Sequence, residues 1–450
     1  MRNRGSRALV LLVYACFAGT AALAAERPEV PARLTLEQAV AIAFEHNPEL
    51  RRADARVAGA AAESDRLRAP RLPQVSISAF DALQTVNLRA RGIQAPEIPG
   101  VGSFLPVRVG PFSQVDARAL VTQEIFNFPL RYRHQAGNAR AEGAEAERVN
   151  ARERLALQVV AAYVEAQRGQ AMEATLRKQL SLARQLYTLT ADRFQQGIAS
   201  SLETKRSLQQ ANNLQQSLLE AENGLTAAKL QLANVMHAKI SSNFELADMT
   251  AFYDTRMMTE PEAVAAALQA RPEYQAAQAQ VRAAELELRA ARSRRLPTLS
   301  FAADYGQSGR APFQNLNTYR IQGSLNIPLY LGGAISAETR QQQSRVEDAR
   351  AYLEEVGSQI ETDVLTALSG VASARRQVEV AEETIRLAGE ELDLSTARFT
   401  SGITDNTEVV NAQDRLARSE ENRIRALFNL SVNRANLQRA TGMAEKAYRP

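Results

Sequence analysis

Side chains that could carry out catalysis are few and widely separated. The three histidines, His46, His134 and His237, have no spacing typical of metal ligands, and we expect them at the surface. The only cysteine is Cys16. The chain has no Gly-x-Ser-x-Gly, no phosphate-binding loop and no Cys-x-x-Cys, and Gly100-Val101-Gly102 lacks the strand and helix that a dinucleotide site requires. The sequence therefore gives no support to an enzyme, a metal centre or a bound cofactor.

Acidic side chains that follow two glycine turns could instead act on ions. Glu203 follows Gly197, and Asp405 and Glu408 follow Gly402. On a single chain such carboxylates are most often only solvated, and such glycines are most often helix C-caps. Around a threefold axis, however, one carboxylate per chain becomes a ring of three, and such rings favour cations in pores. The pattern alone leaves both interpretations open.

These turns belong to an internal duplication. Small and apolar residues step by alternating fours and threes from Leu155 to Tyr187, which is the seam of a coiled coil. Adding 205 to each position gives a second regular seam, from Ile360 to Leu392. Both seams run into one signature, Arg193-Phe194-Gln195-Gln196-Gly197-Ile198 and Arg398-Phe399-Thr400-Ser401-Gly402-Ile403. The repeated unit is therefore a very long helix that ends in a glycine turn.

Each repeat is expected to hold two short helices, two strands and one long helical hairpin, which makes an α+β fold. In the first repeat, Thr35 and Gln38 form a capping-box pattern that begins a helix, and Pro48 ends it. The expected organisation is residues 1–24 as a signal peptide, 25–237 as the first repeat with strands at about 74–86 and 115–128, 238–258 as a polar, irregular equatorial segment between the repeats, 259–442 as the second repeat with strands at about 298–306 and 318–328, and 443–450 as a C-terminal tail.

The expected strands alternate between apolar and polar residues, as in a sheet with two different faces. In the first strand we assign Val75, Ile77, Ala79 and Leu83 to one face and Ser76, Ser78 and Asp81 to the other. In the fourth strand Tyr319, Ile321, Leu325 and Ile327 alternate with Arg320, Gln322, Ser324 and Asn326. An outer lipid face and a wet lumen would give this pattern. Tyr305 and Tyr319 suit an aromatic belt at the bilayer edge and ordinary strand packing equally well.

The first 24 residues are typical of a secretory signal peptide. Three arginines precede an apolar stretch, and Ala22-Leu23-Ala24 offers a small-residue cleavage site for Sec-type export. Lipidation at Cys16 is disfavoured because Tyr14 fits a lipoprotein signal poorly. Without this segment the chain carries 51 basic and 50 acidic residues, so its basicity gives no support to nucleic-acid binding.

The four expected strands are too few to close a barrel within one chain. No later stretch approaches the roughly 18–20 apolar residues of a membrane helix, so a membrane span would have to be a closed barrel of strands. The smallest membrane barrels use about eight strands, whereas three copies of this chain would supply twelve. Soluble hairpins are the alternative for the strands, and a solid coiled-coil rod is the alternative for the helices. The paired strands of the duplication favour a barrel that continues into a helical tube.

Several motifs, in this order and partly duplicated, resemble the TolC-like outer membrane efflux protein family. The resemblance covers about residues 34–442 and includes both glycine-turn signatures. The other matching stretches are Leu34-Thr35-Leu36-Glu37-Gln38-Ala39-Val40 through Asn47-Pro48-Glu49-Leu50, Leu72-Pro73, Thr122-Gln123-Glu124-Ile125-Phe126 and Ile327-Pro328-Leu329-Tyr330-Leu331-Gly332-Gly333. The resemblance implies a homotrimer in the outer membrane lipid of a Gram-negative bacterium, with a twelve-stranded barrel and a periplasmic α-helical coiled-coil barrel.

The resemblance also implies partners and sites. Such channels dock on a periplasmic adaptor and an inner membrane transporter of the RND, ABC or MFS type. The adaptor-contact tip would comprise Gly197, Ile198, Ser200 and Ser201, together with Gly402, Ile403 and Thr404. The pore constriction would involve Glu408 and Glu203. The second acidic position of the family is Asn411 here, so a double acidic ring is in doubt, and Asp405 is the substitute carboxylate that the sequence offers.

The gate departs from the family pattern. The family holds it shut through a tyrosine and an arginine near the second turn, and this chain has Phe399 and Thr404 there. Phenylalanine has no hydroxyl to donate, and threonine cannot form a salt bridge to Glu203. We therefore predict a gate that is held by packing, with Phe194 and Phe399 as its packing residues, or that is held more weakly than in the family.

The resulting function is a passive outer membrane duct for efflux or type I secretion. The alternative is a non-channel periplasmic coiled-coil adaptor or structural protein. An adaptor, however, would carry one helical hairpin between lipoyl-like and small barrel modules, rather than two helix–strand–strand–helix repeats. The cargo stays open among drugs, metals, siderophores and polypeptides, because generic polar residues of a lumen do not identify what passes.

Overall fold

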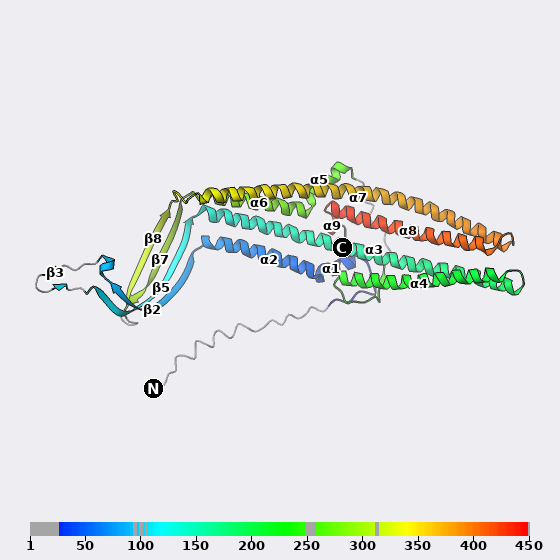
Figure 1. The fold of residues 1–450 in the computed structure, drawn as a ribbon, viewed down its shortest axis with the longest axis horizontal. Coiled ribbons are helices and arrows are strands. Elements are labelled where there is room, and N and C mark those ends of the chain that lie inside the picture. Colours follow the sequence, from blue (N-terminus) through cyan, green and yellow to red (C-terminus); the bar gives the residue numbers. More distant parts are fainter. Residues whose placement is uncertain are drawn as a thin grey trace, which may run out of the picture.

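The structure is a computed structural model that describes residues 27–92, 97–98, 102–103, 106–247, 258–310 and 315–448. It is an elongated α+β molecule, with a four-stranded sheet at one end and two helix turns at the other (Figure 1). The predicted signal peptide and Cys16 lie outside the described residues. Within the described ranges, no helix is both long enough and apolar enough to cross a bilayer.

The helices follow the predicted order twice. They are α1 (Leu36–His46), α2 (Pro48–Arg68), α3 (Phe128–Gln195), α4 (Ser201–Val235), α5 (Glu260–Ala270), α6 (Pro272–Ser293), α7 (Ala334–Thr400), α8 (Asn406–Ala440) and α9 (Ala444–Tyr448). The long helices α3 and α7 have 68 and 67 residues, on the order of 100 Å each. In Figure 1, α2 and α4 lie one after the other beside α3, and α6 and α8 lie likewise beside α7.

The predicted seams are confirmed. No seam position from Leu155 to Tyr187 or from Ile360 to Leu392 is exposed, and Leu155, Val159 and Val364 are completely buried. The capping box of Thr35 and Gln38 also forms, with the backbone amide of each residue donating to the side chain of the other. Burial of small side chains along a narrow seam thus holds each long helix against its neighbours.

The described part of the segment between the repeats, residues 238–247, is more ordered than predicted. Strand β1 (Arg33–Leu34) pairs in parallel with β6 (Glu245–Leu246), within a segment that we expected to be polar and irregular. Phe244 and Leu246 are each only 4% exposed, because they join the core around α1 and α3. The C-terminal tail forms α9 and buries Ala444 completely.

Four antiparallel strands form the sheet in the order β2-β5-β7-β8. Their bounds are β2 (Gln74–Asn87), β5 (Arg108–Phe126), β7 (Thr298–Gly309) and β8 (Asn315–Asn326), and two short strands, β3 (Glu97–Ile98) and β4 (Gly102–Ser103), pair with each other. Three predicted bounds were wrong. Strand β5 begins seven residues before the predicted start at about 115, β7 continues three residues past the predicted end at 306, and β8 begins three residues before the predicted start at about 318.

Glycine misled the prediction of β7. The predicted strand ends at Gly306, but this residue pairs with Arg118 inside the sheet and the strand continues to Gly309. A Cβ at Gly306 would lie 2.4 Å from both the Ala117 carbonyl oxygen and the Arg118 Cβ. Glycine is therefore required here by the close approach of β5, and it does not mark a turn.

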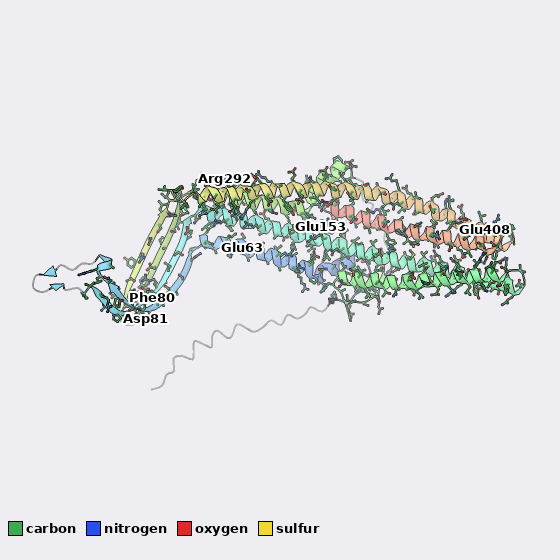
Figure 2. The ribbon with its side chains drawn as sticks, viewed as in Figure 1. Glu63, Phe80, Asp81, Glu153, Arg292 and Glu408 are labelled. Carbon is green, nitrogen blue, oxygen red and sulfur yellow. The ribbon has the colours of Figure 1, made fainter. Side chains whose placement is uncertain are left out.

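The two sheet faces differ as predicted, with one correction. Ile77, Tyr319 and Ile321 are 82%, 76% and 71% exposed on the apolar face. The register from Gln74 to Gln84 is unbroken, so the two-residue period places Asp81 on this apolar face and not on the polar face that we assigned to it. Its carboxylate accepts a hydrogen bond from the Ser113 hydroxyl. Asp81 lies part-way along β2, where the four-stranded part of the sheet ends far from the helices (Figure 2).

Candidate functional site at the two helix turns

The two predicted turns have the same backbone geometry. Gly197 and Gly402 have φ values of +76° and +72°, the left-handed region that favours glycine. The amide of Ile198 donates to the Arg193 carbonyl oxygen, and the amide of Ile403 donates to that of Arg398, both at 2.9 Å. Each glycine therefore ends its helix in the Schellman arrangement, which confirms that both are helix C-caps.

The turns present apolar side chains to solvent. Ile198 and Ile403 are 72% and 68% exposed, and Leu202 is 56% exposed. The remaining predicted tip residues lie at the same end of the molecule; Ser200, Ser201 and Gly402 are exposed and Thr404 is half-buried. A Schellman turn commonly packs its apolar residue back onto the helix, whereas these two isoleucines face outward.

The two turns differ in how they begin the following helix. Ser200 is the N-cap of α4, and its hydroxyl also donates to the Glu203 carboxylate at 3.3 Å. Asp405 is the N-cap of α8, and it accepts from the Thr407 amide at 3.1 Å and from the Thr407 hydroxyl at 3.0 Å. An aspartate has no hydrogen to give to a carboxylate at the third helical position.

Glu408 therefore has a different partner from Glu203. Its carboxylate forms an ion pair with Arg398 of α7, with Nε 3.2 Å from Oε1. Glu408 lies close to the turn end of α8, where Figure 2 labels it. Asn411, which stands at the second acidic position of the family, is exposed. The acidic residues named from sequence thus gather near the turns, but within one chain each has its own partner.

Arg193 joins the two hairpins at this end. Its guanidinium donates to the carbonyl oxygens of Phe399 and Thr400, both at 3.1 Å, and lies 4.6 Å from the centroid of the Phe399 ring. A cation at a helix C-terminus satisfies carbonyls that have no helical partner. Sequence reasoning missed this residue. The signal was its recurrence as Arg398, in the same place of both signatures.

The two phenylalanines of the predicted gate have different environments. Phe399 is 2% exposed and packs with Leu186 and Val409 between the hairpins. Phe194, its counterpart in the first repeat, is 47% exposed. Within one chain, only Phe399 is thus a packing residue, and the role of Phe194 stays a prediction.

Side chains of α4 and α8 also bond across the turn end. The buried Asn406 donates to the Glu203 carbonyl oxygen and to the Ser207 hydroxyl, both at 2.8 Å. Arg206 donates to the Thr407 hydroxyl at 2.9 Å. These contacts, which sequence reasoning also missed, hold the start of α8 against α4.

Known sequences and structures share this duplicated arrangement. The sequence profile described as Outer membrane efflux protein matches residues 39–236 and 263–443, one segment for each repeat. The chain belongs to the outer membrane efflux protein family. Members are outer membrane channels and not enzymes, so the chain is an outer membrane efflux channel with a periplasmic extension.

Individual relatives are distant. The chain is 22% identical over 418 residues to the outer membrane protein TolC of Escherichia coli, covering 88% of this chain and 80% of TolC. It is 28% identical over 184 residues to the outer membrane efflux protein BepC of Brucella suis, which covers 40% of each and so less than two thirds of BepC. A membrane protein of Pseudomonas aeruginosa has a similar fold, with a TM-score of 0.78, 20% identity and coverage of 90% of this chain and 93% of that one.

The three histidines are half-buried, so each lies partly at the surface. Burial and the neighbouring Arg71 lower the pKa of His134, and Arg71 Nη1 lies 3.3 Å from its Nδ1. In the part of the chain that the structure describes, no three histidine, cysteine, aspartate or glutamate residues are grouped to hold a metal ion.

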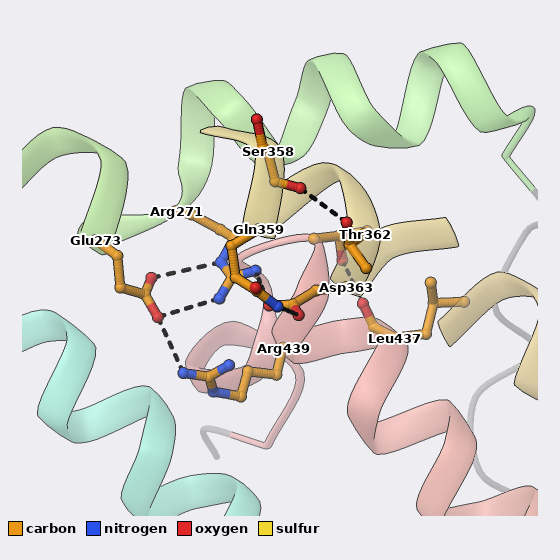
Figure 3. A network of polar contacts seen from close by, with 9 residues as sticks. Arg271, Glu273, Ser358, Gln359, Thr362, Asp363, Leu437 and Arg439 are labelled. Atoms are coloured by element: carbon orange, nitrogen blue, oxygen red, sulfur yellow. Dashed lines mark hydrogen bonds and ion pairs between the residues drawn. The ribbon is translucent and has the colours of Figure 1, made fainter. Parts of the chain in front are cut away.

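A second charged cluster joins the start of α6 to α7 and α8, all within the second repeat (Figure 3). Arg271, which is 4% exposed, donates to Asp363 at 2.8 Å and to Glu273 at 3.2 Å, and Arg439 donates to Glu273 at 2.9 Å. Burial opposes ionisation of Glu273, but the hydrogen bonds and the charge of Arg271 lower its pKa. Arg271-Pro272-Glu273 of the second repeat corresponds to Asn47-Pro48-Glu49 of the first, so the first repeat has an asparagine where this arginine stands.

Proposed function

We propose that three copies of the chain form one passive duct across the outer membrane, as the exit channel of a tripartite efflux or type I secretion system. In this proposal the three sheets close a twelve-stranded barrel, and the helices form a coiled-coil tunnel through the periplasm. The observation that carries the proposal is a set of surfaces that one chain leaves uncovered.

The first of these surfaces is the sheet. Its apolar face is highly exposed, and strands β2 and β8 are edges with no further partner among the described strands (Figure 1). Open edges in lipid would leave backbone groups without hydrogen bonds. Pairing β8 of one copy with β2 of the next removes both edges, and three copies satisfy the even strand number of membrane barrels.

The second surface is a pair of unoccupied helix seams. Leu182 and Leu189 of α3 are 42% and 37% exposed, and Val380, Leu387 and Leu394 of α7 are 67%, 51% and 67% exposed. Both sets step by seven residues, and Leu387 and Leu394 lie 205 positions after Leu182 and Leu189. A heptad spacing of exposed apolar residues on a helix favours a neighbouring helix as its partner. Adjacent copies of the chain would supply it.

The helix turns are the proposed contact with a periplasmic adaptor, which would connect the duct to an inner membrane transporter of the RND, ABC or MFS type. Exposed Ile198 and Ile403 support this, since an apolar tip is suited to burial by a partner. Glu408 and Asp405, with Glu203 and Asn411 nearby, are the proposed constriction, and the packing of Phe399 is the proposed hold on the closed gate.

Introducing charged side chains into the unoccupied seam of α7 tests whether this seam holds the trimer together. We expect Leu387→Glu combined with Leu394→Glu to abolish the trimer, because six carboxylates would enter the apolar contacts between copies. Glu382→Gln, an exposed position of the same helix, is the matched control and should leave the trimer intact. Migration of heat-modifiable, SDS-resistant trimer in outer membrane fractions reports the result. A double variant that still yields the full amount of trimer would refute the proposed seam.

A further inference from the structure

Four charged residues form a cluster on the polar face of the sheet. Arg118 of β5 donates through Nε to Asp116 at 2.6 Å and through Nη1 to Asp304 of β7 at 2.9 Å. Arg320 of β8 pairs with Asp304 across the strands, with its Nε 4.0 Å from the Asp304 carboxylate. Along each strand these residues alternate with the residues of the apolar face. They would therefore line the lumen if the apolar face contacts lipid.

Gly306 makes room for the cluster. It is the partner of Arg118 in the register of β5 and β7, and the Arg118 Cβ occupies the space that a Cβ of residue 306 would need. The Arg118 side chain can therefore pass over the glycine and reach Asp304, two residues away. This arrangement is built into the sheet and does not depend on a flexible surface pair.

The four charges are unequally accessible. The side chains of Asp116 and Asp304 are only 3% and 12% exposed, and that of Arg118 is 27% exposed. Arg320, in contrast, is 70% exposed, and its neighbours on the same face of β8, Thr318 and Gln322, are uncharged. The two carboxylates are covered by Arg118, so the charge that an ion in the lumen would meet first is the guanidinium of Arg320.

We propose that Arg320 sets the charge selectivity of the barrel, by forming a ring of three guanidinium groups that favours anions. This inference rests on the proposed trimer and gives it a second filter, opposite in sign to the carboxylates near the helix turns. A ring of like charges in a confined lumen concentrates counter-ions and repels co-ions. Small anionic cargo would thus be favoured at the barrel, and small cations would be slowed there.

Reversal potentials of the reconstituted channel in a KCl gradient test this inference. We expect Arg320→Gln to raise the ratio of potassium to chloride permeability by about threefold, and Arg320→Glu to raise it further. Gln322→Ser, which changes an uncharged side chain on the same face, is the control and should leave the ratio unchanged. If wild type conducts and both Arg320 variants keep its ratio, the inference is overturned, whereas a wild type without conductance would overturn the proposed function itself.

A cysteine at the same position guards against a variant that folds poorly. Arg320→Cys can be labelled in the assembled channel, because Cys16 is the only natural cysteine and lies in the predicted signal peptide. A cationic methanethiosulfonate should return the permeability ratio towards that of wild type, and an anionic one should raise the ratio further. Equal effects of the two reagents would overturn the role of charge at this position.

Discussion

Glu153 is a buried carboxyl group whose ionisation is expected to work against folding. It lies on α3 in the middle of the molecule (Figure 2) and is 5% exposed. Burial, together with repulsion from Glu273 of α6 and Glu445 of α9, raises its pKa to about 7, although Arg439 of α8 and Arg271 oppose the shift. At neutral pH the proton on Glu153 is therefore only partly retained.

The raised pKa of Glu153 predicts a pH-dependent stability. Between its usual pKa of 4.5 and about 7, the folded chain holds a proton that the unfolded chain has lost, so the free energy of unfolding falls as the pH rises through this window. The loss is complete above pH 7 and amounts to roughly 3 kcal/mol. We expect Glu153→Gln to raise the melting temperature at pH 8 and to change it little at pH 5. Equal changes at both pH values, measured by thermal unfolding in detergent, would contradict this assignment.

The effect of Glu408 on ion selection is expected to depend on its partner, Arg398. Its ion pair with Arg398 neutralises the carboxylate within each chain. We expect Arg398→Gln to free Glu408 and to raise the relative cation permeability of the channel about twofold. Glu382→Gln is the comparison, because this exposed carboxylate of α7 lies outside the proposed constriction and its loss should change selectivity little. Reversal potentials check both variants, and an unchanged ratio in Arg398→Gln would exclude Glu408 from the constriction.

At the scale of elements, the sequence predicts the helices better than the strands. Prolines and the two turn glycines bound the helices, and the seam identifies the buried side of α3 and α7. The end of β7 was missed because glycine has two uses: Gly197 permits a left-handed turn, whereas Gly306 permits the close approach of β5 and Arg118. Only the three-dimensional neighbours separate these two cases.

At the candidate site, the sequence predicts the two turns but not the contacts that distinguish them. The repeated signature predicted both turns and the acidic residues that follow them. It could not predict that Arg193 bonds to the end of α7 while Arg398 bonds to Glu408, since that choice depends on the caps Ser200 and Asp405 and on the packing of the two hairpins. Partners that lie about 200 residues apart in sequence become visible only in the fold.

At the scale of the whole molecule, the duplicated chain leaves several apolar surfaces and strand edges without partners. Two repeats supply the four strands of the sheet and two long helical hairpins. The helices run along one long axis, and the strands are inclined to it (Figure 1). The apolar sheet face, the two sheet edges and the exposed heptad positions of α3 and α7 all remain without partners within the described chain. One chain therefore has the shape of a wall segment, and the proposed duct needs copies to complete it.

The most direct test of the proposed trimeric duct measures the mass and the conductance of the same purified, detergent-extracted channel. We expect a particle of three chains by native mass spectrometry, and discrete single-channel steps when those particles enter a planar bilayer. Leu387→Glu with Leu394→Glu should remove both signals together. Wild-type protein that is monomeric and electrically silent under the same conditions would contradict the central claim.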